Sequence, residues 1–175
     1  MKKLFLLSLF VCIGILQCLA DDFSYTDDNG VTWGCYVTSE DNKTVTINYT
    51  LNSGDVVVIP EKVYKGTSDE YTVTALGFSF RDNKTLESVT LPKTVTVLNG
   101  SLFSGCSSLR EVLNTSQLEG IGSDVFRGCS SLTKVDLSSC TYIGDYAFYI
   151  CSNLVSVGNL KNCTTIESDA FNGCI

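Results

Sequence analysis

Histidine is absent from this chain of 175 residues. Without it the chain cannot build a serine–histidine or cysteine–histidine catalytic pair, and it cannot ligate zinc through imidazole groups. A glycine-rich phosphate-binding loop is also missing, because Gly120 and Gly122 form no more than a short match inside a longer pattern. These absences exclude the nucleophilic hydrolases and nucleotide-binding enzymes that rely on such groups.

Basic residues are scarce, with 12 lysines and arginines against 19 acidic residues and a formal net charge of −7. Nucleic-acid binding needs clustered lysine and arginine side chains that neutralise phosphates. No stretch of this chain carries such a cluster. We therefore exclude nucleic acid as a partner.

Long apolar runs are lacking except near the N-terminus, where Leu4–Leu16 follows Lys2 and Lys3. This run is shorter than the roughly 20 residues needed to cross a membrane. The small-residue pattern Cys18-Leu19-Ala20 follows it, and two aspartates come next. Residues 1–20 are thus predicted to be a cleaved signal peptide of a secreted or cell-surface protein without a transmembrane segment. A lipoprotein signal with Cys18 as the lipidated residue is a less favoured alternative, because glutamine precedes Cys18.

Residues 21–70 predict an N-terminal β-rich cap that ends in an entry hairpin. Apolar and polar residues alternate with a period of two, and Asn29-Gly30 is a strong hairpin signal. A second hairpin is predicted around Gly66, between Val63-Tyr64 and Tyr71-Thr72-Val73. The expected role of this region is to cover the open end of a longer structure.

Residues 71–175 contain a repeat whose last copy is incomplete. Aliphatic residues recur at fixed distances before and after a phenylalanine. The phenylalanines that mark the copies are Phe80, Phe103, Phe126, Phe148 and Phe171. Their spacing and a Leu-x-x-Val-x-Leu core are typical of leucine-rich repeats, in which stacked copies bury one side of each short strand.

The sequence around these phenylalanines resembles the BspA-like leucine-rich repeat class of bacterial surface proteins. The residues that carry this resemblance include Ile121-Gly122, Val125-Phe126, Gly128-Cys129, Ser131-Leu132 and Val89-Thr90-Leu91-Pro92. The predicted fold is a strand-dominated leucine-rich repeat solenoid of the α/β horseshoe class, with one short strand and one short helical turn per repeat. Asn114 and Asn159 stand where leucine is expected, so the later repeats should be less regular.

Cysteine residues follow the same repeat. Seven lie beyond the predicted signal peptide, and an odd number leaves at least one thiol unpaired in an exported protein. Cys106, Cys129, Cys151 and Cys174 each stand one repeat apart, which does not fit the close pairs of a zinc site. We therefore predict a column of small buried side chains, with no metal or cofactor. Cys140 and Cys163 form a second column, for which a disulfide bond is an alternative.

Asp124, Asp145 and Asp169 recur just before the regularly spaced phenylalanines. A row of carboxylates could bind calcium or supply the acid and base of a hydrolase. The favoured interpretation is that these aspartates, with Ser123 and Ser168, cap the predicted helical turns. Capping explains why serine can replace aspartate in this position.

Exposed positions on the repeat strands should form one continuous surface, where solenoid proteins usually bind ligands. The candidate ligand surface consists of Ser88, Thr90, Glu111, Lys134, Asp136 and Ser156. The favoured function is a non-enzymatic binding module for proteins or glycans, and the resemblance implies adhesion to host or matrix proteins. The alternative is a structural scaffold, or a truncated fragment of a larger surface protein, without a ligand of its own. Because the last repeat is incomplete, self-association through an uncapped C-terminal end is also expected.

Overall fold

The computed structural model describes residues 23–51, 54–77 and 80–174. The predicted signal peptide and the alternative lipidation site at Cys18 lie outside these residues. The described residues form twelve β-strands joined by turns, and they contain no helix. In this part of the chain there is consequently no apolar helix that could cross a membrane.

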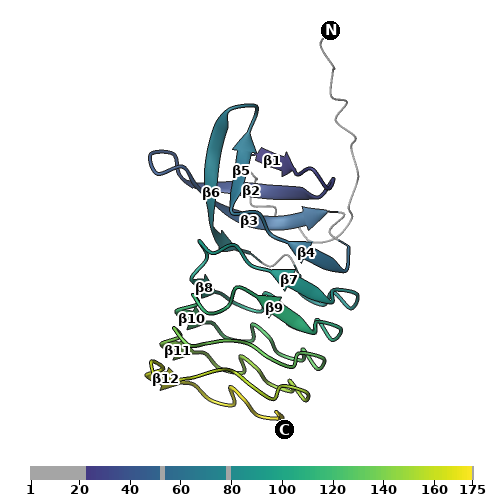
Figure 1. Cartoon of the computed structure of the whole chain (residues 1–175), viewed down its shortest axis with the longest axis vertical. Helices are drawn as coiled ribbons and strands as arrows, with labels where there is room; N and C mark the ends of the chain where they lie inside the picture. The colour runs from purple at the N-terminus through teal and green to yellow at the C-terminus, as the bar shows by residue number, and fades with distance from the viewer. Residues whose placement is uncertain (1–22, 52–53, 78–79, 175) are drawn as a thin grey trace.

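The N-terminal strands form a five-stranded sheet that lies at the top of Figure 1. Its order is β1-β2-β3-β6-β5. The strands are β1 (Phe23–Thr26), β2 (Thr32–Ser39), β3 (Thr44–Leu51), β5 (Lys62–Lys65) and β6 (Asp69–Leu76). Antiparallel pairing of β1 with β2 and of β5 with β6 confirms the two predicted hairpins. That this sheet acts as a cap stays a prediction.

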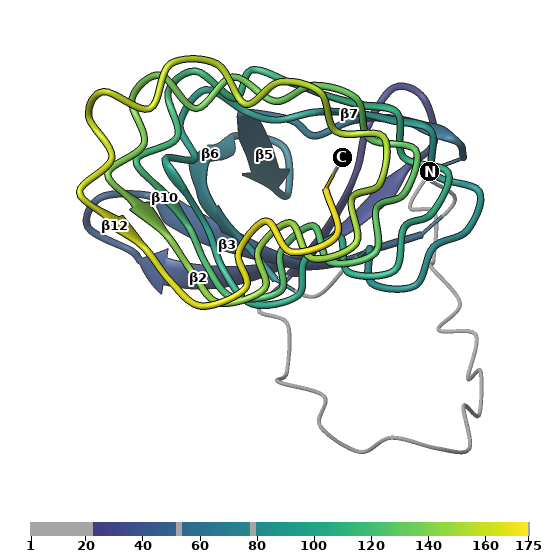
Figure 2. The same cartoon turned by 90° about the horizontal axis from the view of Figure 1, so that it is seen from below.

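The repeats form two narrow parallel sheets on different sides of a stacked coil (Figure 2). One sheet has the order β4-β7-β9 and the other has the order β12-β11-β10-β8. The first contains β4 (Val56–Val58), β7 (Ser88–Thr90) and β9 (Glu111–Leu113). The second contains β8 (Val97–Leu98), β10 (Gly120–Ile121), β11 (Tyr142–Ile143) and β12 (Thr165–Ile166). Although β4 lies among the residues assigned to the cap, it pairs with β7 and begins the first of these sheets.

The core of the stack contains one phenylalanine from each repeat. Phe80, Phe103, Phe126 and Phe148 are almost completely buried, and Phe171 is partly buried. Neighbouring rings are stacked with their centroids 5.1 to 5.5 Å apart. The column of aromatic rings therefore continues through all five copies, as the phenylalanine period predicts.

The predicted helical turn around each phenylalanine is not seen. In the repeat of Phe103, the N–H groups of Ser101, Phe103 and Gly105 donate to carbonyl groups of the next repeat along the chain. The N–H groups of Ser104 and Cys106 close turns three residues back instead. An α-helix needs every N–H group for bonds four residues back, so donation to the next repeat prevents it.

Replacing Phe126 with alanine should lower the free energy of unfolding by about 3–5 kcal/mol, because the change leaves a cavity between two stacked rings. Denaturant-induced unfolding followed by circular dichroism measures this loss. The matched control is Phe171→Ala, since Phe171 is partly exposed and stacks on Phe148 alone among the described residues. Equal losses for the two variants would contradict a continuous aromatic core.

Candidate functional site

The six predicted surface residues lie on the exposed face of the β4-β7-β9 sheet and its continuation. Along each strand a buried valine separates two outward positions, which are exposed in β4 and β9 and partly buried at Ser88 and Thr90 of β7. Beyond β9 the pairing is reduced to single parallel bridges from Glu111 to Lys134 and from Lys134 to Ser156. The later repeats are therefore less regular on this face, as predicted, whereas regular parallel pairing continues to β12 on the other face. We call this surface the ladder face.

The ladder face contains two parallel columns of side chains. Ser88, Glu111, Lys134 and Ser156 follow one another in the first column. The hydroxyl group of Ser88 donates to Oε1 of Glu111 over 3.0 Å. Thr90 and Asp136 belong to the second column, at equivalent repeat positions on either side of Leu113. The structure thus brings all six residues onto one surface, while ligand binding there stays a prediction.

A groove of about 470 Å³ crosses the ladder face between β9 and residues 133–136. Its lining includes Glu111, Leu113, Lys134 and Asp136. The groove opens where Asn114 replaces the leucine of the repeat pattern. Asn114 adopts a left-handed conformation with φ 59°, and its side-chain amide donates to the carbonyl group of Leu91 over 2.9 Å.

The buried side chain of Thr115 closes the floor of this groove. Its hydroxyl oxygen accepts a hydrogen bond of 3.0 Å from the backbone N–H of Asp136. A side chain therefore takes a place that a backbone carbonyl would occupy in a regular ladder. Leu113 remains 46% exposed beside it and is not among the predicted site residues. The constant repeat step from Thr90 to Leu113 and on to Asp136 could have identified it.

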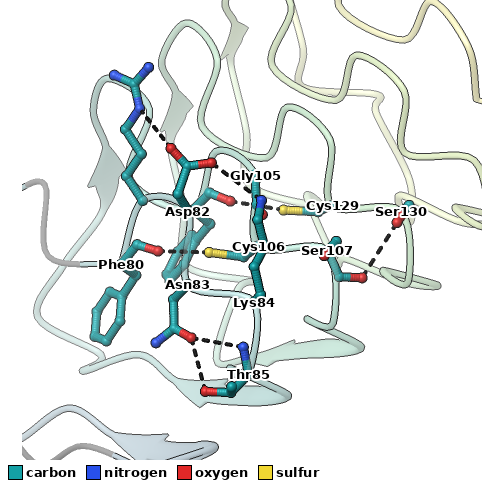
Figure 3. A network of polar contacts seen from close by, with 12 residues as sticks. Phe80, Asp82, Asn83, Lys84, Thr85, Gly105, Cys106, Ser107, Cys129 and Ser130 are labelled. Atoms are coloured by element: carbon teal, nitrogen blue, oxygen red, sulfur yellow. Dashed lines mark hydrogen bonds and ion pairs between the residues drawn. The ribbon is translucent and has the colours of Figure 1, made fainter.

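The cysteine column consists of thiols that hydrogen-bond to the preceding repeat (Figure 3). The thiol of Cys106 donates to the carbonyl oxygen of Phe80, and that of Cys129 donates to the carbonyl oxygen of Phe103. Cys151 and Cys174 continue the pattern. Each carbonyl oxygen also accepts a backbone N–H bond within its own repeat. The first copy carries Asn83 in this place, and its side chain bonds to Thr85 and Leu86.

Burial in the repeat corner keeps these thiols protonated. Desolvation raises the pKa of Cys106 to about 11 and the pKa of Cys151 to about 12. The pKa of Cys129 is raised well above its ordinary value for the same reason. A thiolate is the nucleophile and the metal ligand of cysteine chemistry, so these residues are suited to packing rather than to reaction. The prediction of a column of small buried side chains is confirmed for Cys106, Cys129 and Cys151, whereas Cys174 is partly buried.

Cys140 and Cys163 are free thiols in this structure. Each donates to a carbonyl oxygen two residues further on, which belongs to Tyr142 for Cys140 and to Thr165 for Cys163. The structure therefore contains no disulfide bond between them.

The aspartates before each phenylalanine do not cap helices, since no helix is present in the described residues. Asp124 accepts a hydrogen bond of 3.0 Å from Arg127, whereas Asp145 accepts the backbone N–H of Ser168 in the next repeat. Asp169 bonds to the side chain of Asn172. The described residues include no group of three or more histidine, cysteine, aspartate or glutamate side chains arranged to hold a metal ion.

Short parallel strands on two sides of a stacked coil, with a leucine and valine core, define a leucine-rich repeat protein. A family model described as "BspA type Leucine rich repeat region" matches residues 76–175 in six copies. The chain belongs to this family. Proteins of the family are typically non-enzymatic, and they are found at the cell surface or are secreted.

Solved structures of bacterial leucine-rich repeat proteins have the same fold. A leucine-rich repeat protein of T. pallidum is 27% identical with a TM-score of 0.71, and the match covers 86% of this chain and 67% of that protein. A leucine-rich cell surface protein of Faecalibacterium prausnitzii is 26% identical with a TM-score of 0.63, over 87% of this chain and 46% of that one. A Bacteroides ovatus leucine-rich repeat protein has a TM-score of 0.62 at 23% identity, over 81% of this chain and 43% of that one. No curated protein matches the chain.

Alkaline pH should weaken the fold through the cysteine column. Because the folded state raises these pKa values above the ordinary 9.0, the unfolded chain loses protons first as the pH rises. The free energy of unfolding should therefore be unaffected below about pH 8 and fall between about pH 9 and 12, by up to about 1.4 kcal/mol per pH unit for each thiol.

Urea unfolding measured across this range tests the expectation. The variant Cys151→Ala should show a shallower decline with pH than the wild type. The control Val125→Ala removes buried apolar volume but no titratable group, so its decline should match the wild type. The same slope in all three proteins would contradict a contribution from the thiols.

Proposed function

We propose that the chain is an exported adhesion module that binds a protein partner on the ladder face. The observation that carries this proposal is the groove between β9 and residues 133–136, which interrupts an otherwise regular surface. It offers an apolar side chain, Leu113, beside a carboxylate and an amine. Apolar contact supplies affinity at an interface, and flanking charges select the partner and its orientation.

The family supports this proposal, since leucine-rich repeat domains generally mediate protein binding. The predicted signal peptide adds export from the cell. A cleaved signal, attachment at the surface and a host or matrix ligand are all parts of the proposal. The comparison proteins extend beyond the matched region, so a longer assembly of repeats is a natural setting for such a surface.

The exposed strand β4 favours a protein over a glycan as the occupant. Val56 and Val58 are 67% and 61% exposed, and they continue the two columns of the ladder face. Exposed valines gain more from contact with apolar side chains than from contact with sugar hydroxyl groups. Glycan binding, self-association and a purely structural role are the alternatives, and the following experiment distinguishes a protein partner from a purely structural role.

Charge reversal at Glu111 should weaken partner binding, because the change places a second positive charge beside Lys134 in the first column. Immobilised residues 21–175 would be exposed to surface-protein extracts, and saturable partners would be quantified by titration. We expect Glu111→Lys to reduce apparent affinity by about tenfold, the effect of losing roughly 1.4 kcal/mol.

The matched control is Glu119→Lys, which makes the same chemical change in the same repeat. Glu119 precedes β10 and therefore lies beside the other repeat sheet. The Glu119→Lys variant should therefore bind the partner with the affinity of the wild type. Absence of any saturable partner would favour the structural role, whereas equal loss in both variants would show that net charge, rather than the ladder face, controls binding.

A further inference from the structure

Two positions, one on either side of the phenylalanine, have left-handed backbone conformation in every repeat where the structure describes them. Two residues before it stand Ser101, Asp124, Tyr146 and Asp169, with φ between 48° and 59°. Two residues after it stand Asp82, Gly105, Gly128, Ile150 and Gly173, also with positive φ. Glycine, aspartate and serine tolerate this conformation better than a bulky side chain does. Among the copies named, the repeat of Phe148 alone has bulky residues at both positions, namely Tyr146 and Ile150.

The strained side chains are exposed rather than buried. Tyr146 is 36% exposed and Ile150 is 48% exposed, and neither belongs to the core cluster or packs against it. A β-branched residue with positive φ is a true conformational outlier. Ile150 also lies close to Gly173 of the next repeat, since a Cβ atom added to that glycine would approach its Cγ1 to 3.3 Å. Strain of this kind at exposed positions is characteristic of functional sites.

Two further residues complete a surface cluster around them. The ring of Tyr149 meets the ring of Tyr146 edge to face, with centroids 5.4 Å apart. The guanidinium group of Arg127, from the preceding repeat, lies 5.6 Å from the ring of Tyr146 and 5.2 Å from that of Tyr149. Asp124 holds the same guanidinium group through an ion pair of 3.0 Å. The guanidinium group therefore packs against both rings. We call Arg127, Tyr146, Tyr149 and Ile150 the tyrosine patch.

The composition of the tyrosine patch is that of a protein-interface hot spot. Tyrosine and arginine are enriched at such centres, where an apolar surface is removed from water. The exposed isoleucine favours an apolar protein side chain over a sugar, because it offers no hydrogen-bonding group to hydroxyls. Rigid aromatic contacts also lose little conformational entropy on binding.

The charges around the tyrosine patch favour a basic partner. Arg127 is already neutralised by Asp124. Asp145, Glu167 and Asp169 lie in the same or the next repeat and form no ion pair with a described basic residue. The whole chain is acidic as well, with a formal net charge of −7. A partner with lysine or arginine around its apolar contact would thus gain electrostatic attraction.

We propose that the tyrosine patch is a second contact site, which docks a protein surface that presents an apolar side chain surrounded by basic residues. This inference rests on the proposed function as a protein-binding module. It assigns contact to residues outside the ladder face, at the corner of the repeat rather than on its strands.

Substitution by the residues of the other repeats tests the proposal. The double variant Tyr146→Asp, Ile150→Gly removes the two strained side chains of the tyrosine patch and relieves the left-handed strain. Its free energy of unfolding should equal or exceed that of the wild type. A merely structural role predicts destabilisation instead. The matched control is Ser101→Asp, which makes a polar change at the same repeat position away from the patch.

The probe is a labelled peptide with a central tryptophan between lysines in a glycine–serine background, and its binding is measured by fluorescence anisotropy. Matched peptides carry glutamate for lysine, or glycine for tryptophan. The lysine–tryptophan peptide should bind wild type and Ser101→Asp alike, and bind the double variant at least about tenfold more weakly. Both altered peptides should bind more weakly to the wild type.

Several results would overturn the proposal. One is that the wild type binds the glutamate peptide as tightly as the lysine–tryptophan peptide, or does not bind the lysine–tryptophan peptide at all. Another is that the double variant binds the lysine–tryptophan peptide as tightly as the wild type does. A further one is that a glycan competes with this peptide for the tyrosine patch. If the wild type forms a concentration-dependent dimer and the double variant does not, the tyrosine patch binds a second copy of the chain instead of a basic partner. If the double variant still captures the partner that Glu111→Lys loses, this inference fails while the ladder-face function stands. If neither assay finds a partner, both fail.

Discussion

Backbone hydrogen bonding between repeats is the constraint on which the rest of this structure depends. No described repeat has a helix or hairpin of its own, so the N–H and C=O groups that do not close short turns within the repeat find partners in the repeats before and after it. Buried backbone groups without partners are strongly disfavoured. The nearly constant length of the repeat follows directly, because a different step would misalign donors and acceptors along the whole coil.

The carbonyl oxygen of the repeated phenylalanine shows this pairing requirement most clearly. It accepts a backbone N–H from its own repeat and a thiol from the next, as Phe103 does with Cys106 and Cys129. A carbonyl has two lone pairs, and both are used without any polar side chain entering the core. Cysteine suits this place because it is small, buried and able to donate. The packing of the ring and the bonding of its backbone are thus fixed together.

The fold could be predicted from the sequence to a large extent, because buried residues recur at the repeat period in a repeat protein. The recurrence of Phe103 as Phe126 and Phe148 identified the core, and the equal spacing of the cysteines identified their packing role. The helical turn was predicted wrongly because local spacing does not reveal that Ser101 and Phe103 donate to the next repeat. Such donation depends on the stacked neighbour.

The candidate sites were predictable only in part. The ladder face followed from alternation along the strands, but Leu113 was missed although it occupies the same outward position as Thr90 and Asp136, because only polar outward residues were predicted as candidates. The tyrosine patch was missed for another reason. Tyr146 and Ile150 occupy positions whose left-handed conformation results from the stacking of the repeats. Hydrophobic periodicity reports which residues are buried, so it could not predict this backbone strain.

The buried side chains of each repeat recur from copy to copy, whereas the exposed side chains differ. This difference has an evolutionary consequence. Since most coils bond to their neighbours through equivalent backbone groups, unequal recombination between gene copies can delete, duplicate or exchange whole units with little change of register. A surface feature such as the tyrosine patch occupies little more than one unit and the side chain of Arg127 before it. Binding specificity in this architecture can therefore be inherited, lost or shuffled in single steps of one coil.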